Sequence, residues 1–119
     1  MKYIINTSKP EEFKTEVFSC IENKKDKSNS EIKTWDLKND TDDENNKLLV
    51  HTTEAWDSVG CLSLNVDETN KSIIVKFYYW ESYPKDKRTG KEKFYLYGRL
   101  TELLLSHFGS SFSSINLEP

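Results

Sequence analysis

The sequence predicts an α+β fold: an antiparallel β-meander of five to six strands, with an N-terminal and a C-terminal helix packed on one face. Apolar and polar residues alternate along several segments in the middle of the chain, and the links between these segments are of hairpin length. Apolar residues at helical spacing occur near both ends. The chain has 119 residues, the length of one domain, so residues 1–119 are expected to form a single α+β domain.

The first third of the chain predicts a strand, a helix and a second strand. Lys2–Asn6 has the pattern of a short strand. Ser8 and Glu11 have the spacing of a helix-capping box around Pro10. The helix that follows places four apolar side chains on one face, namely Phe13, Val17, Cys20 and Ile21. Glu31–Lys38 alternates between apolar and polar residues and predicts the next strand.

The central part of the chain predicts three more strands. Lys47–Thr53 follows the polar connection Asn39–Asn46, and a turn is expected over Glu54–Gly60. Cys61–Val66 then pairs through a short turn with the long strand Ser72–Tyr83. Both faces of this long strand are rather apolar, so one face is expected under the helices and the other against a partner. The same feature is compatible with a homodimer.

The last third predicts a hairpin, a helix and a tail. Pro84–Gly90 reads as a basic hairpin loop that leads into a strand over Lys91–Tyr97. The longest apolar stripe then predicts a helix over Gly98–Phe108, with Gly109 as its C-terminal stop. The tail, Ser110–Pro119, is expected to add a short edge strand.

The charge balance argues against nucleic acid as the main partner. The chain has 17 basic and 20 acidic residues and a net charge of −3, whereas nucleic-acid-binding domains usually show a basic excess. Cys20 and Cys61 belong to no CxxC motif, and the N-terminus lacks the pattern of a signal peptide. No segment approaches the length of a membrane span. These features predict a cytoplasmic protein with reduced thiols and no membrane association.

Few residues offer catalytic or metal-binding chemistry. His51 and His107 are the two histidines, and such a pair is able to act as acid and base in RNA cleavage. A calcium loop that starts at Asp40 needs Gly at its sixth position and Glu at its twelfth, where this chain has Asn45 and His51. No Gly-rich phosphate loop and no zinc-ligand cluster occurs. The sequence therefore predicts a binding protein without a cofactor, and a small His-dependent enzyme is one alternative.

Aromatic and basic residues meet near the end of the long strand. Trp80 lies among tyrosines and is followed by Lys85, Lys87 and Arg88. Interleaved rings and cations are able to bind single-stranded nucleic acid by stacking and phosphate contact. The signature of the RNA-recognition motif is absent. A small RNA-binding module that uses residues 78–91 is therefore the other alternative.

The segment Tyr97–Phe108 (YGRLTELLLSHF), together with the preceding Trp-containing strand, polar loop and meander, resembles the small immunity proteins of bacterial contact-dependent growth inhibition and polymorphic toxin systems. The resemblance is one of architecture; it covers most of the chain and includes no diagnostic motif. It implies a protein that is not an enzyme. Such a protein binds the C-terminal domain of a cognate toxin, often a nuclease, and blocks its active site or substrate surface.

This interpretation predicts a toxin-binding surface that combines tryptophan anchors with carboxylates. The carboxylates mimic phosphate in a basic cleft, and the rings supply the desolvated centre of the contact. The expected toxin-binding residues are Trp35, Asp36, Asp40, Asp42, Asp43, Glu44, Trp56 and Asp57. Replacing Asp42 and Asp43 with lysine is predicted to slow association with the toxin without unfolding the domain.

Overall fold

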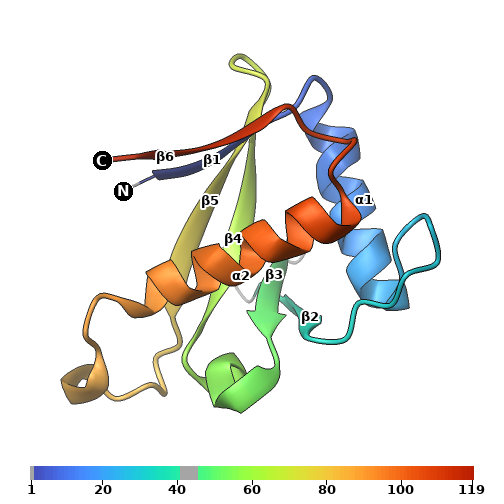
Figure 1. Cartoon of the computed structure of the whole chain (residues 1–119). Coiled ribbons are helices and arrows are strands. Elements are labelled where there is room, and N and C mark those ends of the chain that lie inside the picture. Colours follow the sequence, from blue (N-terminus) through green and yellow to red (C-terminus); the bar gives the residue numbers. More distant parts are fainter. Residues whose placement is uncertain (1, 41–45) are drawn as a thin grey trace.

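The computed structural model describes residues 2–40 and 46–119, and it contains two α-helices and a six-stranded sheet (Figure 1). The elements are β1 (Lys2–Asn6), α1 (Pro10–Asn23), β2 (Trp35–Asn39), β3 (Lys47–His51), β4 (Gly60–Asp67), β5 (Ser72–Tyr79), α2 (Glu92–His107) and β6 (Ser114–Glu118). Two short 3₁₀ helices, η1 (Thr53–Ser58) and η2 (Lys85–Lys87), lie in the connections. The predicted α+β fold, with an N-terminal and a C-terminal helix on an antiparallel sheet, is confirmed.

The strand order is β2-β3-β4-β5-β1-β6, and every neighbouring pair is antiparallel. β2 to β5 form the predicted meander. β1 then pairs with β5, with Tyr3 opposite Val75, and β6 pairs with β1, with Leu117 opposite Tyr3. The expected C-terminal edge strand is therefore present, and both chain ends lie at this edge of the sheet (Figure 1).

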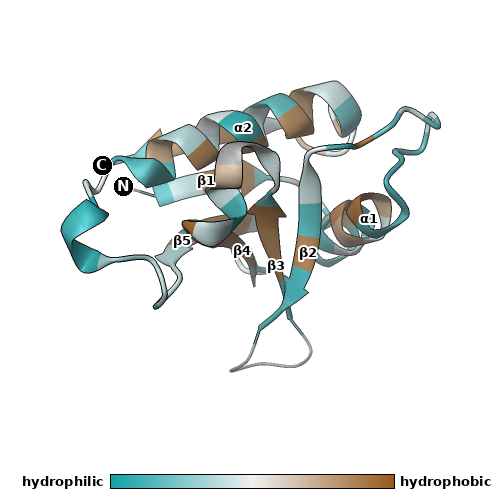
Figure 2. Cartoon of the chain, turned by 90° about the horizontal axis from the view of Figure 1, so that it is seen from below, coloured by the Kyte–Doolittle hydropathy of each residue, from teal (hydrophilic) through white to brown (hydrophobic). Residues whose placement is uncertain are grey.

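Both helices pack on one face of the sheet. Alternation along each strand puts one set of apolar side chains under the helices. The strands contribute Tyr3, Ile5, Leu49, Leu62, Leu64, Ile73 and Val75, and the helices contribute Phe13, Val17, Ile21, Leu96, Leu100 and Leu104. In Figure 2 the apolar colour runs along β3 and β4 inside the molecule, whereas α1 and α2 carry both colours. Because both helices cover this face, the opposite face of the sheet carries no helix.

The predicted apolar face of α1 is confirmed, but its predicted capping box is wrong. Phe13, Val17 and Ile21 are buried in the core. The helix begins at Pro10, and its N-cap is Lys9, which makes no side-chain capping bond. A residue before proline is disfavoured in the helical conformation, so Lys9 stays outside the helix and the cap moves one residue beyond Ser8.

The prediction for the region before the last helix is also wrong. Residues 91–97 form no strand, and α2 begins at Glu92, so Pro84–Gly90 connects β5 to a helix instead of closing a hairpin. Aromatic residues suggested a strand there, but Glu92, Leu96 and Leu100 share one face of a helix. The helix ends at His107, and the amide of the C-cap residue Phe108 donates to the carbonyl of Leu104. Gly109 follows this cap residue at the predicted position of the stop, but its φ is not in the left-handed region.

Three central elements are shorter or differ in type. β2 begins at Trp35 instead of Glu31, because its partner strand β3 ends at His51, directly opposite Trp35. β5 ends at Tyr79, four residues before the predicted end. The segment expected as a turn over residues 54–60 is largely the 3₁₀ helix η1.

Candidate functional site

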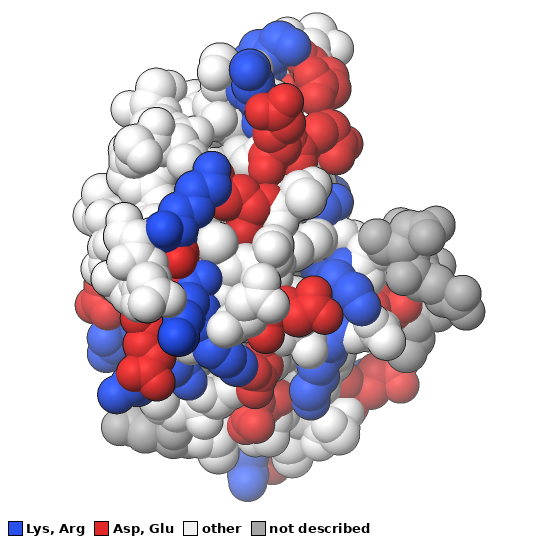
Figure 3. All heavy atoms as spheres, turned by 90° about the vertical axis from the view of Figure 1, so that its right-hand side faces the viewer, with Lys and Arg blue, Asp and Glu red and all other residues white. Residues whose placement is uncertain are grey.

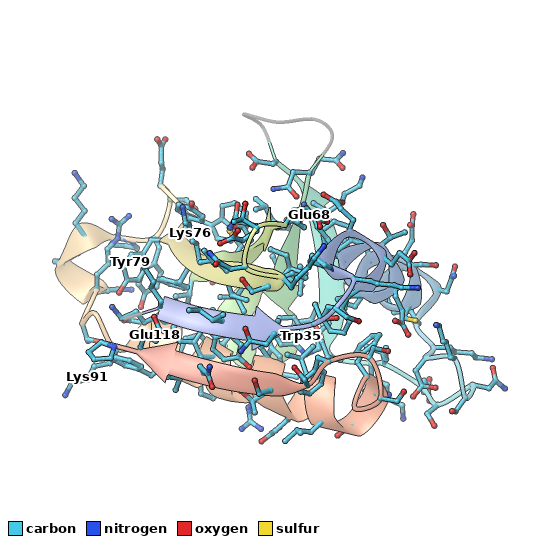
Figure 4. All side chains as sticks on the ribbon, turned by 90° about the horizontal axis from the view of Figure 1, so that it is seen from above. Trp35, Glu68, Lys76, Tyr79, Lys91 and Glu118 are labelled. Atoms are coloured by element: carbon cyan, nitrogen blue, oxygen red, sulfur yellow. The ribbon has the colours of Figure 1, made fainter. Side chains whose placement is uncertain are left out.

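The face of the sheet that carries no helix is called here the open face. Over β2 to β5, its side chains come from alternate positions of the strands: Asp36, Lys38, Leu48, Val50, Cys61, Ser63, Asn65, Ile74, Lys76 and Tyr78. Figure 4 shows Lys76 on the side of the sheet away from α2. The large ring of Tyr78 is 49% exposed on this face. An exposed aromatic ring beside charged groups is typical of a binding surface.

A groove of about 1100 Å³ crosses the open face. We call it the open-face groove, and its lining consists of Lys38, Asn39, Asp40, Asn46, Leu48, Asp57, Ser58, Cys61, Ser63, Asn65, Tyr78, Tyr79, Trp80, Glu81 and Ser82. These residues belong to the four strands β2 to β5 and to the segments that connect or follow them. The groove is thus a product of the pairing of β2 to β5, and no single sequence motif encodes it.

The floor of the open-face groove consists of buried side chains and a hydrogen-bonded asparagine. Leu48, Cys61 and Ser63 are buried there. The Asn65 amide donates to Ser63 Oγ at 2.9 Å and to the carbonyl of Ile74 at 3.1 Å. Burial, together with the nearby charge of Asp40, raises the pKa of the Cys61 thiol to about 12. The thiol therefore stays protonated at neutral pH and offers no thiolate nucleophile.

Trp80 forms one wall of the open-face groove. Its indole N–H donates to the carbonyl of Asp57 at 2.7 Å, and its amide donates to the carbonyl of Val59 at 3.1 Å. The Arg88 guanidinium donates to the Trp80 carbonyl at 3.1 Å. The Lys38 ammonium lies over the Trp80 ring, 5.4 Å from its centroid. The polar edge of the indole is satisfied by the protein itself, so the ring face is what this wall presents to a ligand.

The described lining of the open-face groove is acidic. It includes the carboxylates of Asp40, Asp57 and Glu81 and one cationic group, the ammonium of Lys38. Asn46 Oδ1 is buried, and no donor among the described residues reaches it. A groove with excess negative charge fits a ligand that carries positive charge and N–H donors.

A hydrogen-bonded cluster fixes the connection between β5 and α2 beside this wall. Glu92 is 8% exposed, accepts the hydroxyl of Tyr79 at 2.6 Å, and accepts both the amide and the hydroxyl of Thr89. Burial on its own raises the pKa of Glu92, but these bonds outweigh it and lower the pKa from 4.5 to about 2. The Arg88 guanidinium stacks over the Tyr79 ring at 4.8 Å. The cluster thereby anchors the chain that carries Trp80 and Glu81.

The structure brings together only some of the predicted toxin-binding residues. Asp40 and Asp57 line the open-face groove. Trp35 is wrong as a surface anchor, because it is 3% exposed and packs in the core against His51. Asp36 forms an ion pair with Lys24 at the end of α1. The other members of the set are Trp56, which stacks on Tyr95 at 4.1 Å, and Asp42, Asp43 and Glu44, which lie outside the described residues.

Several groove residues were missed or assigned to another role. Lys38, Asn46, Tyr78 and Glu81 were not in the predicted set, and Trp80 was considered only for RNA. A usable signal was present in the sequence, because strict alternation over β4 and β5 puts Cys61 and Tyr78 on one face. The contact between Trp80 and η1 could not be predicted from the sequence, because it depends on the register of the β4–β5 pair.

The two histidines are each held by their own contacts. His51 is 4% exposed and shares a 2.8 Å hydrogen bond with Thr53, beside a smaller cavity of about 410 Å³. His107 lies 2.7 Å from Asp26 and ties the loop after α1 to the end of α2. Within residues 2–40 and 46–119, no group of three or more His, Cys, Asp and Glu side chains is arranged to hold a metal ion.

The basic segment after β5 is partly committed to structure. Arg88 donates to the carbonyls of Tyr83 and Trp80, so its guanidinium is turned toward the protein. Lys85 and Lys87 are exposed. The opposite side of the molecule, at the right of Figure 1, carries interspersed basic and acidic side chains (Figure 3).

Comparisons with protein-family models, with curated proteins and with solved structures found no match to this chain. In the part of the chain that the structure describes, neither helix is long and apolar enough to cross a membrane.

Proposed function

We propose that this protein is an immunity protein, which binds a cognate bacterial toxin domain and neutralises it by covering its active site or substrate surface. The toxin class that fits is a nuclease, because nucleases present a basic cleft for the phosphates of their substrate. The observation that carries the proposal is the open-face groove, where three carboxylates and a fixed tryptophan wall meet on an uncovered sheet face.

Electrostatics and ring burial have separate tasks in such a complex. The carboxylates of Asp40, Asp57 and Glu81 attract a basic surface and raise the association rate. Tyr78 and Trp80 supply apolar area that is desolvated on binding, and this area slows dissociation. Because Trp80 is already held by hydrogen bonds, little conformational entropy is lost when a partner covers it.

Inhibition by binding requires no reaction on this chain, and the groove chemistry is consistent with that. The Cys61 thiol stays protonated, and the side chains that line the groove include no histidine. The protein is therefore proposed to act stoichiometrically, in the cytoplasm of the cell that makes the toxin, without a cofactor.

A double charge reversal tests the proposal. Asp57→Lys with Glu81→Lys changes the groove by four charge units and is expected to lower the association rate with the toxin domain at least ~10-fold and to weaken inhibition in proportion. The control is Glu22→Lys on the exposed surface of α1, which changes two charge units outside the groove. Stopped-flow association at two salt concentrations measures the effect. Equal rates for the groove variant and wild type would remove the open-face groove from the contact.

A further inference from the structure

The open-face groove already holds a cation against an aromatic ring. The Lys38 ammonium lies 5.4 Å from the centroid of the Trp80 ring, within the range of a cation–π interaction. Lys38 belongs to the edge strand β2 and is exposed, and it forms no ion pair with the described part of the chain. An exposed lysine is a weak occupant of such a site, because its ammonium is strongly hydrated.

The ring itself is much better fixed than its cation. Trp80 is held through its indole N–H, its amide and its carbonyl, with partners at 2.7 to 3.1 Å. The ring therefore keeps its orientation whether or not Lys38 covers it. A preorganised ring face that meets only an exposed lysine of the same chain is available to a better-matched external cation.

The surrounding acceptors favour a ligand with several donors. Asp40, Asp57 and Glu81 line the same groove. A guanidinium is planar, carries five N–H donors and stacks on aromatic faces, whereas an ammonium is a compact and strongly hydrated charge. The combination of ring face and clustered acceptors matches arginine better than lysine.

We propose that the open-face groove binds an arginine side chain of its protein partner against Trp80, and that Lys38 is the internal cation which this arginine displaces. The inference deepens the proposed function, on which its choice of a basic protein partner rests. It makes Lys38 a negative determinant of affinity, although Lys38 lies in the binding groove.

The experiment titrates the ¹⁵N-labelled protein with argininamide, lysinamide and citrullinamide at constant ionic strength and follows the Trp80 indole N–H by NMR. Argininamide is expected to shift this signal saturably and to bind at least about threefold more tightly than lysinamide. Citrullinamide, which keeps the shape of the side chain without its charge, is expected to cause no saturable shift.

Two lysine variants separate the site from a general charge effect. Lys38→Met keeps the side-chain stem and removes the charge, so argininamide affinity is expected to rise about threefold or more. Lys76→Met is the matched control, because Lys76 lies on the open face but does not line the groove. Trp80→Leu is expected to abolish saturable binding, and Trp80→Phe to weaken it; both variants lack the indole signal, so their titrations are followed through the backbone amide of Tyr78, which also lines the groove, and their spectra report their fold.

Equal binding of argininamide and lysinamide would overturn the inference, as would equal effects of Lys38→Met and Lys76→Met. These titrations use no toxin, so the two proposals fail separately. A protein that inhibits a basic toxin but ignores argininamide loses the arginine site and keeps its proposed function. A protein that binds argininamide as described but has no basic protein partner keeps the site and loses the proposed function.

Discussion

At the scale of single residues, the buried carboxylate of Glu92 holds in place the segment that carries Trp80, which forms one wall of the groove. Glu92 gathers the Tyr79 hydroxyl and both polar groups of Thr89 at the start of α2. A charged acceptor with several donors contributes more than an ordinary hydrogen bond, and a lost partner leaves buried groups unsatisfied. The cluster is therefore a structural support of the groove, although it lies outside the predicted site.

Replacing Glu92 with glutamine is expected to lower the free energy of unfolding by about 1–3 kcal/mol, because the donors of Tyr79 and Thr89 lose a charged acceptor. Urea denaturation at pH 7 measures the loss. Glu102→Gln is the matched control, because that carboxylate pairs with Arg99 on the surface and is expected to matter little. Equal effects of the two substitutions would contradict the role assigned to the cluster.

The same carboxylate predicts an acid-dependent loss of stability. The folded state lowers the pKa of Glu92 from 4.5 to about 2, so its stabilisation is fully present above pH 4.5 and is lost as the pH falls toward 2. Wild type is therefore expected to lose more stability than Glu92→Gln between pH 5 and pH 2.5. Thermal unfolding of both proteins across this range tests the prediction, and parallel curves would contradict it.

At the scale of elements, two glycines give a matched pair of predictions. A Cβ at Gly60 in β4 meets the Tyr78 carbonyl at 2.4 Å and the Phe77 ring at 2.8 Å, whereas a Cβ at Gly98 in α2 meets nothing within 4 Å. Gly60→Ala is expected to cost about 1–3 kcal/mol through overpacking. Gly98→Ala is expected to stabilise by about 0.5–1 kcal/mol through helix propensity. Chemical denaturation of both variants measures the difference, and a neutral Gly60→Ala would contradict the packing of β4 on β5.

Most of the elements could be predicted from periodicity, and the errors have physical causes. The alternation of β4 and β5 and the apolar face of α1 were sufficient, because one face of each is buried in the core. A strand was predicted for residues 91–97 because aromatic residues favour strands. The helical spacing of the buried residues Glu92 and Leu96 becomes visible only when the whole of α2 is considered. At α1, the restriction that Pro10 places on Lys9 outweighed the capping-box pattern.

At the scale of the whole molecule, the arrangement of the layers creates the groove. Two helices on one side of a six-stranded sheet leave the other side open, and there Trp80 packs against a small apolar cluster of Leu48, Val50 and Cys61. The sequence indicated an apolar second face on β5, and this led to the prediction of a partner. It also indicated Asp40 and Asp57 as binding residues, and both line the groove.

The rest of the site depends on contacts between distant parts of the chain. Trp35 was expected at the surface, but the register of β2 against β3 turns it into the core beside His51. Trp80 reaches Asp57 only because β4 and β5 pair over their full length. Pairing register of this kind follows from tertiary packing, so it could not be predicted from local sequence patterns.

The central claim is that the open-face groove binds one basic protein partner, and a capture experiment with three baits tests it most directly. Tagged wild type, Asp57→Lys/Glu81→Lys and Glu22→Lys are used as baits in lysates of the source cells, with the partner identified by mass spectrometry and its nuclease activity measured. We predict that wild type and Glu22→Lys recover the same stoichiometric basic nuclease and abolish its activity, and that the groove variant recovers little of it. Equal recovery by all three baits, or recovery of RNA or of the bait alone, would contradict the account.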